Sequence, residues 1–298
     1  QPYGTQTIRV KGNVSGREAS GAFSVKAIIT TVTPSIGTVG SRLTISGTGF
    51  GASIKGTITL GQTSAWGTFT PSSSGTFTAA FSVDAQVCGT KTISAFDTSG
   101  ASSTVTGSFT LIPSLKVTPT EGTIGKPIVV EGWGYGNENV KIKLGVTPTI
   151  ATGTANANGT FSVSFTVDTQ YQQASTPIKG TGENTGASAT TSFKIKIQIT
   201  GLDPIQGTIG RTVNVQGNGA SYDPDGGNGE VKYQFGSKID YKPINSDGTF
   251  NFDFVVDTQI GGVTNLRITD NSGGGGEDYA ERTFTILPNI WVSPTAGT

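Results

Sequence analysis

Hydrophobic and polar residues alternate in short runs along this chain, and the runs are separated by glycine, asparagine, aspartate and serine. The clearest runs carry an apolar residue at every second position, which predicts strands with one face buried and one face in water. Their apolar positions are Phe77, Ala79, Phe81 and Val83; Phe161, Val163, Phe165 and Val167; and Phe250, Phe252, Phe254 and Val256. With 44 glycines and abundant serine and threonine, the sequence favours many short strands over long helices.

A tight turn precedes each of these strands, and an acid ends it. The turns are Ser74-Gly75-Thr76, Asn158-Gly159-Thr160 and Asp247-Gly248-Thr249, and the acids are Asp84, Asp168 and Asp257. Asn-Gly and Asp-Gly adopt positive φ readily and favour tight hairpin turns. We expect the acids to accept hydrogen bonds from the residues that follow them; a metal shared at the unit junctions is the alternative.

The strands belong to a repeat that returns every 85 to 90 residues. The phrase Pro-x-x-Gly-Thr begins at Pro34, Pro119, Pro204 and Pro294, at spacings of 85, 85 and 90 residues. Such a period predicts a tandem array of small units, each with one modest core. We divide the chain into a partial unit at 1–30, complete units at 31–113, 114–198 and 199–288, and the first strand of a further unit at 289–298.

Each complete unit contains about seven predicted strands, which is typical of an immunoglobulin-like (Ig-like) β-sandwich. The segments that join the units are short and contain proline, at 112–115 and 287–290. Proline stiffens such a joint and prevents one strand from running into the next. The predicted fold is therefore all-β, with tandem Ig-like sandwiches in an extended, semi-rigid array.

The two ends of the chain match parts of a unit. Residues 4–8 match residues 89–93, so about two strands at the N-terminus correspond to the last third of a repeat. Either the chain is a window on a longer array, or the ends of neighbouring chains complement one another in a filament. The two partial units together still lack the middle strands of a repeat, which favours the first interpretation.

Composition excludes several classes of function. Twenty basic and 20 acidic residues leave no net charge, so the positive surface that neutralises nucleic-acid phosphates is missing. No run approaches the roughly 18 apolar residues of a membrane span. Without histidine and with Cys88 as the single cysteine, no Ser-His-Asp or Cys-His arrangement can form, and we expect no enzyme activity.

The opening of the repeat resembles IPT/TIG-type Ig-like domains of bacterial and archaeal surface proteins. In the first unit the resemblance rests on residues 32–40 and on the paired glycines of Gly47-Thr48-Gly49-Phe50; the second unit keeps the pattern as Gly132-Trp133-Gly134-Tyr135. The third unit has Ala220 where the pattern has an aromatic residue. The resemblance covers nearly the whole chain and implies an extracellular structural or adhesive role.

The third unit also resembles domains of the polycystic-kidney-disease (PKD) type, in residues 219–227 and 231–236, although Tyr233 stands where that family usually has tryptophan. This stretch contains the densest cluster of oxygen ligands in the sequence. Calcium prefers six to eight carboxylate, amide and carbonyl oxygens, so the cluster is a candidate Ca²⁺ site; an Asx-rich turn is the alternative. The candidate ligands are Asp223, Asp225, Asn228 and Glu230. We expect no other cofactor.

Two Asn-x-Ser/Thr sequons make Asn13 and Asn158 candidate glycosylation sites. Three tryptophans, Trp66, Trp133 and Trp291, are candidate platforms for carbohydrate stacking, although a packing role is favoured for Trp133. Cys88 is interpreted as a small turn or core residue.

We therefore expect a non-enzymatic structural component of an extracellular surface assembly: an S-layer, stalk or fibre at the cell surface. Its partners would be copies of itself or neighbouring surface proteins. The alternative is an adhesin or carbohydrate-binding surface protein, with glycans as partners. Exposed aromatic residues clustered on one loop face would favour that alternative.

Overall fold

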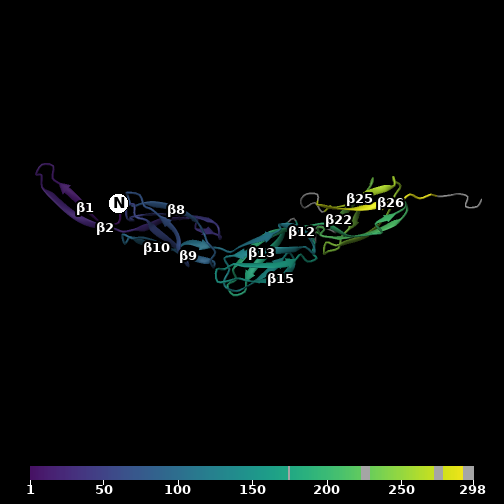
Figure 1. The fold of residues 1–298 in the computed structure, drawn as a ribbon, viewed down its shortest axis with the longest axis horizontal. Coiled ribbons are helices and arrows are strands. Elements are labelled where there is room, and N and C mark those ends of the chain that lie inside the picture. Colours follow the sequence, from purple (N-terminus) through teal and green to yellow (C-terminus); the bar gives the residue numbers. More distant parts are fainter. Residues whose placement is uncertain (174, 223–228, 272–277, 291–298) are drawn as a thin grey trace, which may run out of the picture.

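Residues 1–173, 175–222, 229–271 and 278–290 are described by the structure, a computed structural model. Every regular element in this part of the chain is a β-strand, which confirms the predicted all-β class. The strands form three bodies in a bent row, and a hairpin projects from the first body (Figure 1). The array is therefore extended, with the units placed end to end.

The projecting hairpin pairs β1 (Gly4–Lys11) with β2 (Glu18–Val25) antiparallel. Tyr3, immediately before β1, donates its backbone N–H to the carbonyl of Phe50 in the first body, at 3.1 Å. The hairpin therefore starts at the first body and points away from it (Figure 1).

The first unit contains eight strands in two sheets. They are β3 (Ile28–Thr33), β4 (Ile36–Gly37), β5 (Arg42–Thr48), β6 (Gly56–Leu60), β7 (Thr63–Phe69), β8 (Phe77–Ser82), β9 (Gly89–Asp97) and β10 (Ser102–Leu111). One sheet has the order β3-β5-β8 and the other β4-β10-β9-β6-β7. All pairings are antiparallel except that of β4 with β10. This order is that of an Ig-like sandwich.

The second unit repeats this arrangement strand for strand. Its strands are β11 (Ser114–Thr118), β12 (Glu121–Thr123), β13 (Pro127–Trp133), β14 (Asn139–Leu144), β15 (Thr147–Thr154), β16 (Phe161–Thr166), β17 (Thr176–Gly182) and β18 (Ser188–Lys196). The two sheets have the orders β11-β13-β16 and β12-β18-β17-β14-β15.

The third unit has the same order again. Its strands are β19 (Gln198–Asp203), β20 (Gln206–Gly207), β21 (Thr212–Asn218), β22 (Glu230–Phe235), β23 (Lys238–Pro243), β24 (Phe250–Val255), β25 (Gly262–Asp270) and β26 (Tyr279–Ile286). Its sheets have the orders β19-β21-β24 and β20-β26-β25-β22-β23. The tandem Ig-like fold predicted from the repeat is confirmed.

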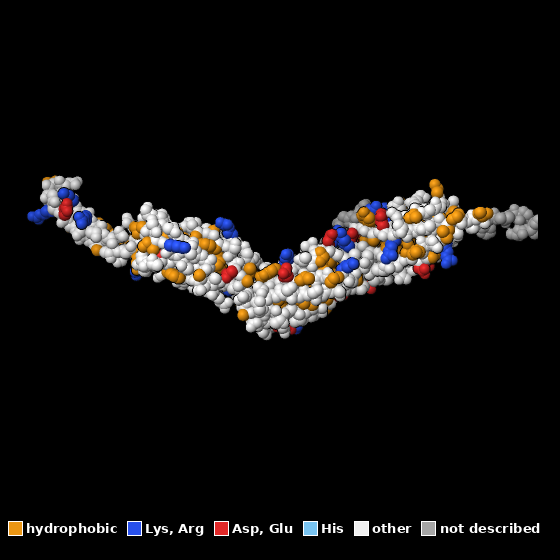
Figure 2. Space-filling model, viewed as in Figure 1, with side chains coloured by type: hydrophobic (Ala, Val, Ile, Leu, Met, Phe, Trp, Pro, Cys, Tyr) orange, Lys and Arg blue, Asp and Glu red, His pale blue; other side chains and the backbone are white. Residues whose placement is uncertain are grey.

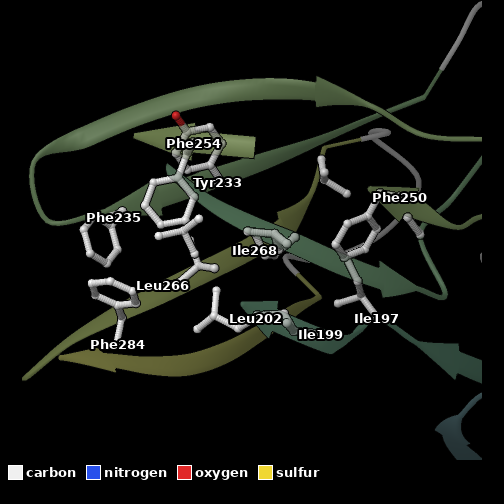
Figure 3. Close-up of a cluster of buried hydrophobic side chains, with 14 of the residues drawn as sticks. Ile197, Ile199, Leu202, Tyr233, Phe235, Phe250, Phe254, Leu266, Ile268 and Phe284 are labelled. Atoms are coloured by element: carbon white, nitrogen blue, oxygen red, sulfur yellow. The ribbon is translucent and has the colours of Figure 1, made fainter. Parts of the chain in front are cut away.

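Each unit encloses its own hydrophobic core between its two sheets, and the three cores are separate. The alternating strands β8, β16 and β24 supply the predicted apolar face. In the third unit, Phe235 packs 4.8 Å from the ring of Phe254 and 5.5 Å from the ring of Phe284, centroid to centroid (Figure 3). The core of this unit begins at Ile197, in the segment that joins it to the second unit.

The first glycine of each recurring pair makes room for the phenylalanine that opens the alternating strand. A Cβ on Gly132 would lie 2.1 Å from the ring of Phe161, and a Cβ on Gly217 would lie 2.0 Å from the ring of Phe250. Glycine is therefore required on β13 and β21 because an aromatic ring occupies the position where a side chain would begin.

Truncation of a core ring should destabilise a unit strongly. We expect Phe235→Ala to lower the free energy of unfolding of the third unit by about 3–5 kcal/mol, because it removes a fully buried ring and leaves a cavity. Tyr241→Ala, on the exposed face of β23, should change it by no more than about 0.5 kcal/mol. Urea unfolding with amide hydrogen exchange resolved by unit measures both; equal losses would contradict the assignment of the core.

Candidate functional site: the joints between units

The segment that precedes the last two strands of one unit, or the two strands of the hairpin, lies against the loops of the next unit. At each of three joints, a backbone N–H in this segment donates to the carbonyl of the second paired glycine of the following unit or of the residue directly after it. The bonds run from Tyr3 to Phe50 (3.1 Å), from Cys88 to Gly134 (3.2 Å) and from Gln172 to Ala220 (2.9 Å). A backbone bond depends little on side-chain identity, so the same joint forms although the residues differ.

The glycine of each tight turn is part of the same joint. A Cβ on Gly248 would lie 2.6 Å from the Cα of Tyr171 in the preceding unit, and one on Gly75 would lie 2.8 Å from the Cα of Pro2. Both glycines have positive φ, +80° and +76° respectively. The sequence predicted a hairpin turn here, but the turn instead connects strands of different sheets, β7 with β8 and β23 with β24, and it receives the preceding unit. A larger residue there would push the units apart.

The second glycine of each pair lies against the linker that enters its own unit. A Cβ on Gly49 would lie 2.3 Å from the carbonyl oxygen of Lys26, and one on Gly219 would lie 2.5 Å from that of Lys196. Close approach of the two backbones fixes where the linker leaves the preceding unit. The paired glycines thus have two roles, core packing and positioning of the linker.

The joint between the second and third units has further contacts. The rings of Tyr171 and Tyr222 meet edge to face with 6.0 Å between their centroids, and Gln172 forms an isolated parallel bridge with Ser221. The side-chain amide of Gln198 donates to the carbonyl of Ile124 at 3.0 Å. Each of these contacts joins a residue of the second unit to a residue of the third.

The recurring acids hold the segment that makes the joint. Asp84 accepts a hydrogen bond from the hydroxyl of Thr63 and another from the side-chain amide of Gln86, at 2.7 Å. The second unit repeats this set as Thr147, Asp168 and Gln170, and the third keeps Asp257 with Gln259. In all three units the acid accepts from a glutamine two residues further on, and in the first two it also accepts from a threonine of the neighbouring strand. These bonds hold the segment that reaches the next unit.

A second set of carboxylates, which the sequence analysis missed, fastens the loops that receive the preceding unit. In the first unit Asp97 accepts the backbone N–H of Gly51 at 2.8 Å, and in the third Asp270 accepts that of Ser221 at 3.1 Å. Asp97 and Asp270 end the seventh strand of their units, whereas in the second unit the acid comes from the loop before the fourth strand, β14. There Glu138 accepts the N–H of Thr185 at 2.9 Å and that of Gly136 at 3.2 Å. Because the acid changes loops, no single repeat position identifies the role.

The environment of Glu138 favours its ionised form. Burial raises the pKa of this carboxyl, but hydrogen bonds from the hydroxyl and N–H of Thr185 and from the N–H groups of Asn184 and Gly136 outweigh burial and hold the pKa below its ordinary value. The carboxylate therefore stabilises the loops at neutral pH. Nearby, burial raises the pKa of the Tyr135 hydroxyl, which stays protonated.

The candidate calcium site falls largely outside the described residues. Asp223, Asp225 and Asn228 lie in that part of the chain, and Glu230 is exposed at the start of β22. Among the residues that the structure describes, no group of three or more histidine, cysteine, aspartate or glutamate side chains is placed to hold a metal ion. Calcium binding stays a prediction.

Both candidate glycosylation sites are exposed. Asn13 lies in the turn between β1 and β2, and Asn158 lies in the turn before β16, next to the joint between the first and second units. A glycan on either side chain would point into solvent. Attachment stays a prediction.

The tryptophans and the cysteine have structural surroundings where they are described. Trp66 packs 5.1 Å from the ring of Phe81 and donates its indole N–H to the carbonyl of Ser82. Trp133 is half-buried at the end of β13, and Trp291 lies outside the described residues. Cys88 is a free, half-buried thiol at the joint between the first and second units.

The search for membrane-spanning helices found none in the part of the chain that the structure describes. Charged side chains are thinly spread over the face in Figure 2, and hydrophobic side chains lie among them on each unit. This distribution agrees with the balanced charge of the sequence.

No protein-family profile and no curated protein sequence matches this chain. The resemblance to the IPT/TIG and PKD families therefore stays a prediction. Similar solved structures include a tetra-tandem repeat from the extending region of a large adhesion protein, with 16% identity, 87% of this chain and 74% of that chain covered, and a TM-score of 0.27. A four-domain ICAM-5 ectodomain fragment has 15% identity, coverage of 96% and 84%, and a TM-score of 0.27.

A structure of a 1.5-MDa bacterial ice-binding adhesin has 15% identity, coverage of 88% and 96%, and a TM-score of 0.20. At these identities and TM-scores, the assignment of the fold rests on the strand order of the chain itself. This order is that of tandem Ig-like sandwiches.

Acid should destabilise the second unit through Glu138. Because its folded pKa is lower than the ordinary value of 4.5, the carboxylate stabilises the unit above that value, and the contribution is lost as the pH falls through the lower folded pKa. Glu138→Gln should weaken the unit at pH 7 and reduce the further loss between pH 5 and pH 2. Unfolding of the second unit, followed by amide exchange, is the measurement. Glu131→Gln is the control, and an unchanged pH dependence in Glu138→Gln would contradict this role.

Removal of one backbone donor should loosen one joint. Cys88→Pro lacks the N–H that bonds to Gly134, whereas Cys88→Ala keeps it. With spin labels attached through Thr78→Cys and Ser162→Cys, both on exposed positions, we expect Cys88→Pro to broaden the distribution of inter-unit distances. Cys88→Ala should leave the distribution unchanged. Identical distributions in the two variants would mean that this bond does not hold the joint.

Proposed function

We propose that this chain is a non-enzymatic structural component of an extracellular surface assembly, in which tandem Ig-like units form a semi-rigid rod. The observation that carries the proposal is the recurrence of the joint. Three successive junctions use a backbone hydrogen bond to the same loop of the following unit, and glycines recur where the units approach most closely. A chain whose recurring residues maintain spacing and direction between units is suited to spanning distance.

Composition supports the same function. The chain has no histidine, and its recurring acids are engaged in hydrogen bonds that hold loops. An S-layer, a stalk and a fibre each require repeated units with defined geometry at the cell surface, which is where we place the protein. Copies of the chain or neighbouring surface proteins are the proposed partners.

An adhesin or carbohydrate-binding protein is less well supported. Such a function favours several exposed aromatic residues on one loop face. The exposed aromatic side chains in the described part of the chain instead lie on strands of different units, on the hairpin or directly before it: Phe96, Tyr241, Tyr279, Phe23 and Tyr3. Their separation favours a structural role.

Stretching of single molecules tests the mechanical part of the proposal. A chain tethered at its two ends should unfold in three separate events, one for each unit. Each event should release roughly 25–30 nm, as expected for an 85- to 90-residue repeat. A single cooperative event, or gradual extension without steps, would contradict a row of independent mechanical units.

Labelling of intact cells tests the location. Antibody raised against this chain should decorate unpermeabilised cells of the source organism in a continuous layer or along filaments. Labelling only after permeabilisation would overturn the proposed surface role, whatever the result of the stretching experiment.

A further inference from the structure

The N-terminal hairpin has the strand register of the last two strands of a complete unit. The first glycine of each pair of strands lies opposite an aliphatic residue near the end of the partner strand. These pairs are Gly4 with Val25, Gly89 with Leu111, and Gly262 with Ile286. Two residues further along, Phe23, Phe109 and Phe284 occupy equivalent positions. The hairpin is thus aligned with β9–β10 and with β25–β26.

Equivalent side chains have opposite exposure in the hairpin and in a complete unit. Ile8 is 56% exposed and Phe23 is 44% exposed, whereas Ile93 and Phe109, at the matching positions of the first unit, are both 0% exposed. Val10 is 63% exposed where the first unit has buried Ala95. The hairpin therefore presents to solvent the face that a complete unit turns toward its second sheet.

This apolar face is hollowed. A surface cavity of about 420 Å³ is lined by Ile8, Val10 and Phe23 together with residues 19–22. In the complete units the same side of the strand pair is covered by the three-stranded sheet, and both edges of the pair bond to further strands. In the second unit, for example, β18 pairs with β12 and β17 pairs with β14.

We propose that this hairpin is a docking surface for the complementary six strands of a repeat of this same type, equivalent to Ile28–Ser82 of the first unit. Such a half-unit supplies what the hairpin lacks: a three-stranded sheet with an apolar inner face, and one strand for each free edge. The occupant follows from three complete units in the same chain, each of which covers the equivalent strands in this way.

The position of Phe23 indicates which kind of side chain the occupant places against it. Its equivalent in the third unit, Phe284, contacts the ring of Phe235 on β22 edge to face. A partner should therefore place a large apolar side chain of its fourth strand against Phe23. At the turn end of the hairpin, next to Val10, the charged side chains of Lys11 and Glu18 lie 3.2 Å apart.

The first joint fixes the direction of the docking surface. Tyr3 is bonded to Phe50, and Pro2 lies against Gly75, as Cys88 and Gln86 lie against the second unit. A half-unit bound to the hairpin would thus complete a further sandwich in line with the row. This inference rests on the proposed function as a rod, and it adds a surface on the hairpin where a further half-unit would attach.

Fusion of a half-unit to the whole chain tests the docking surface. Residues 28–85 are joined directly to Gln1, which reproduces the Ala85–Gln86 connection of the first unit. We expect the amides of β1 and β2 to exchange at least tenfold more slowly than in the unfused chain, and stretching to give a fourth unfolding event. Phe23→Asp should abolish both effects, whereas Thr7→Asp, on the opposite face, should preserve them.

A second fusion covers the case in which the first half-unit packs poorly on the hairpin. It carries residues 114–169 in place of 28–85, so Gln1 follows Asp168 by two residues, as it follows Asp84 by two residues in the first fusion. If neither fusion protects the hairpin, the proposal is overturned. It is also overturned if Phe23→Asp converts a dimer of the unfused chain into a monomer, since the occupant would then be a second hairpin. Loss of binding to phosphatidylcholine–phosphatidylglycerol vesicles in Phe23→Asp would overturn it in favour of a lipid surface. In each of these cases the three-event stretching of the rod would be unaffected.

Discussion

Each unit depends on covering the apolar face of a five-stranded sheet with a three-stranded sheet. Aromatic and aliphatic side chains make the contact, and the alternation along β8, β16 and β24 determines which side chains of these strands enter it. A strand whose pattern slipped by one residue would turn its phenylalanines to solvent, so the period of two maintains the register. The glycine at the start of each pair belongs to the same constraint, because an aromatic ring lies where its Cβ would be.

The joints between units also depend on close backbone approach at glycines. Backbone amides of one unit bond to backbone carbonyls of the following unit, and turn glycines allow the two backbones to approach closely. Such contacts tolerate variation of the side chains, and the residues at the joints do vary, from Tyr3 to Cys88 to Gln172. The carboxylates of Asp84 and Glu138 act one step back from the joint, by fixing the segments that meet there. Many modest bonds at recurring places thus hold neighbouring units together.

The hairpin combines the apolar sheet face of a unit with a joint of the kind that links the units. It has the strand register and the apolar face of a complete unit, and it is attached to the first unit through the same kind of joint. What it lacks is the sheet that covers the face. For this reason the kind of apolar surface that is buried in the core of a complete unit is a candidate docking surface on the hairpin.

The sequence alone determined the all-β class, the repeat and the inward faces of the alternating strands, because these follow from local spacing along the chain. It also identified the recurring glycines, and it predicted that the recurring acids accept hydrogen bonds from the residues that follow them, as Asp84 does from Gln86. Only the tertiary structure revealed that Gly248 receives the preceding unit, that Asp84 is bonded to Thr63 and Gln86, and that Glu138 in one unit replaces Asp97 and Asp270 of the others. These contacts join residues far apart in sequence, or on different loops in different units, and no local pattern encodes such pairings.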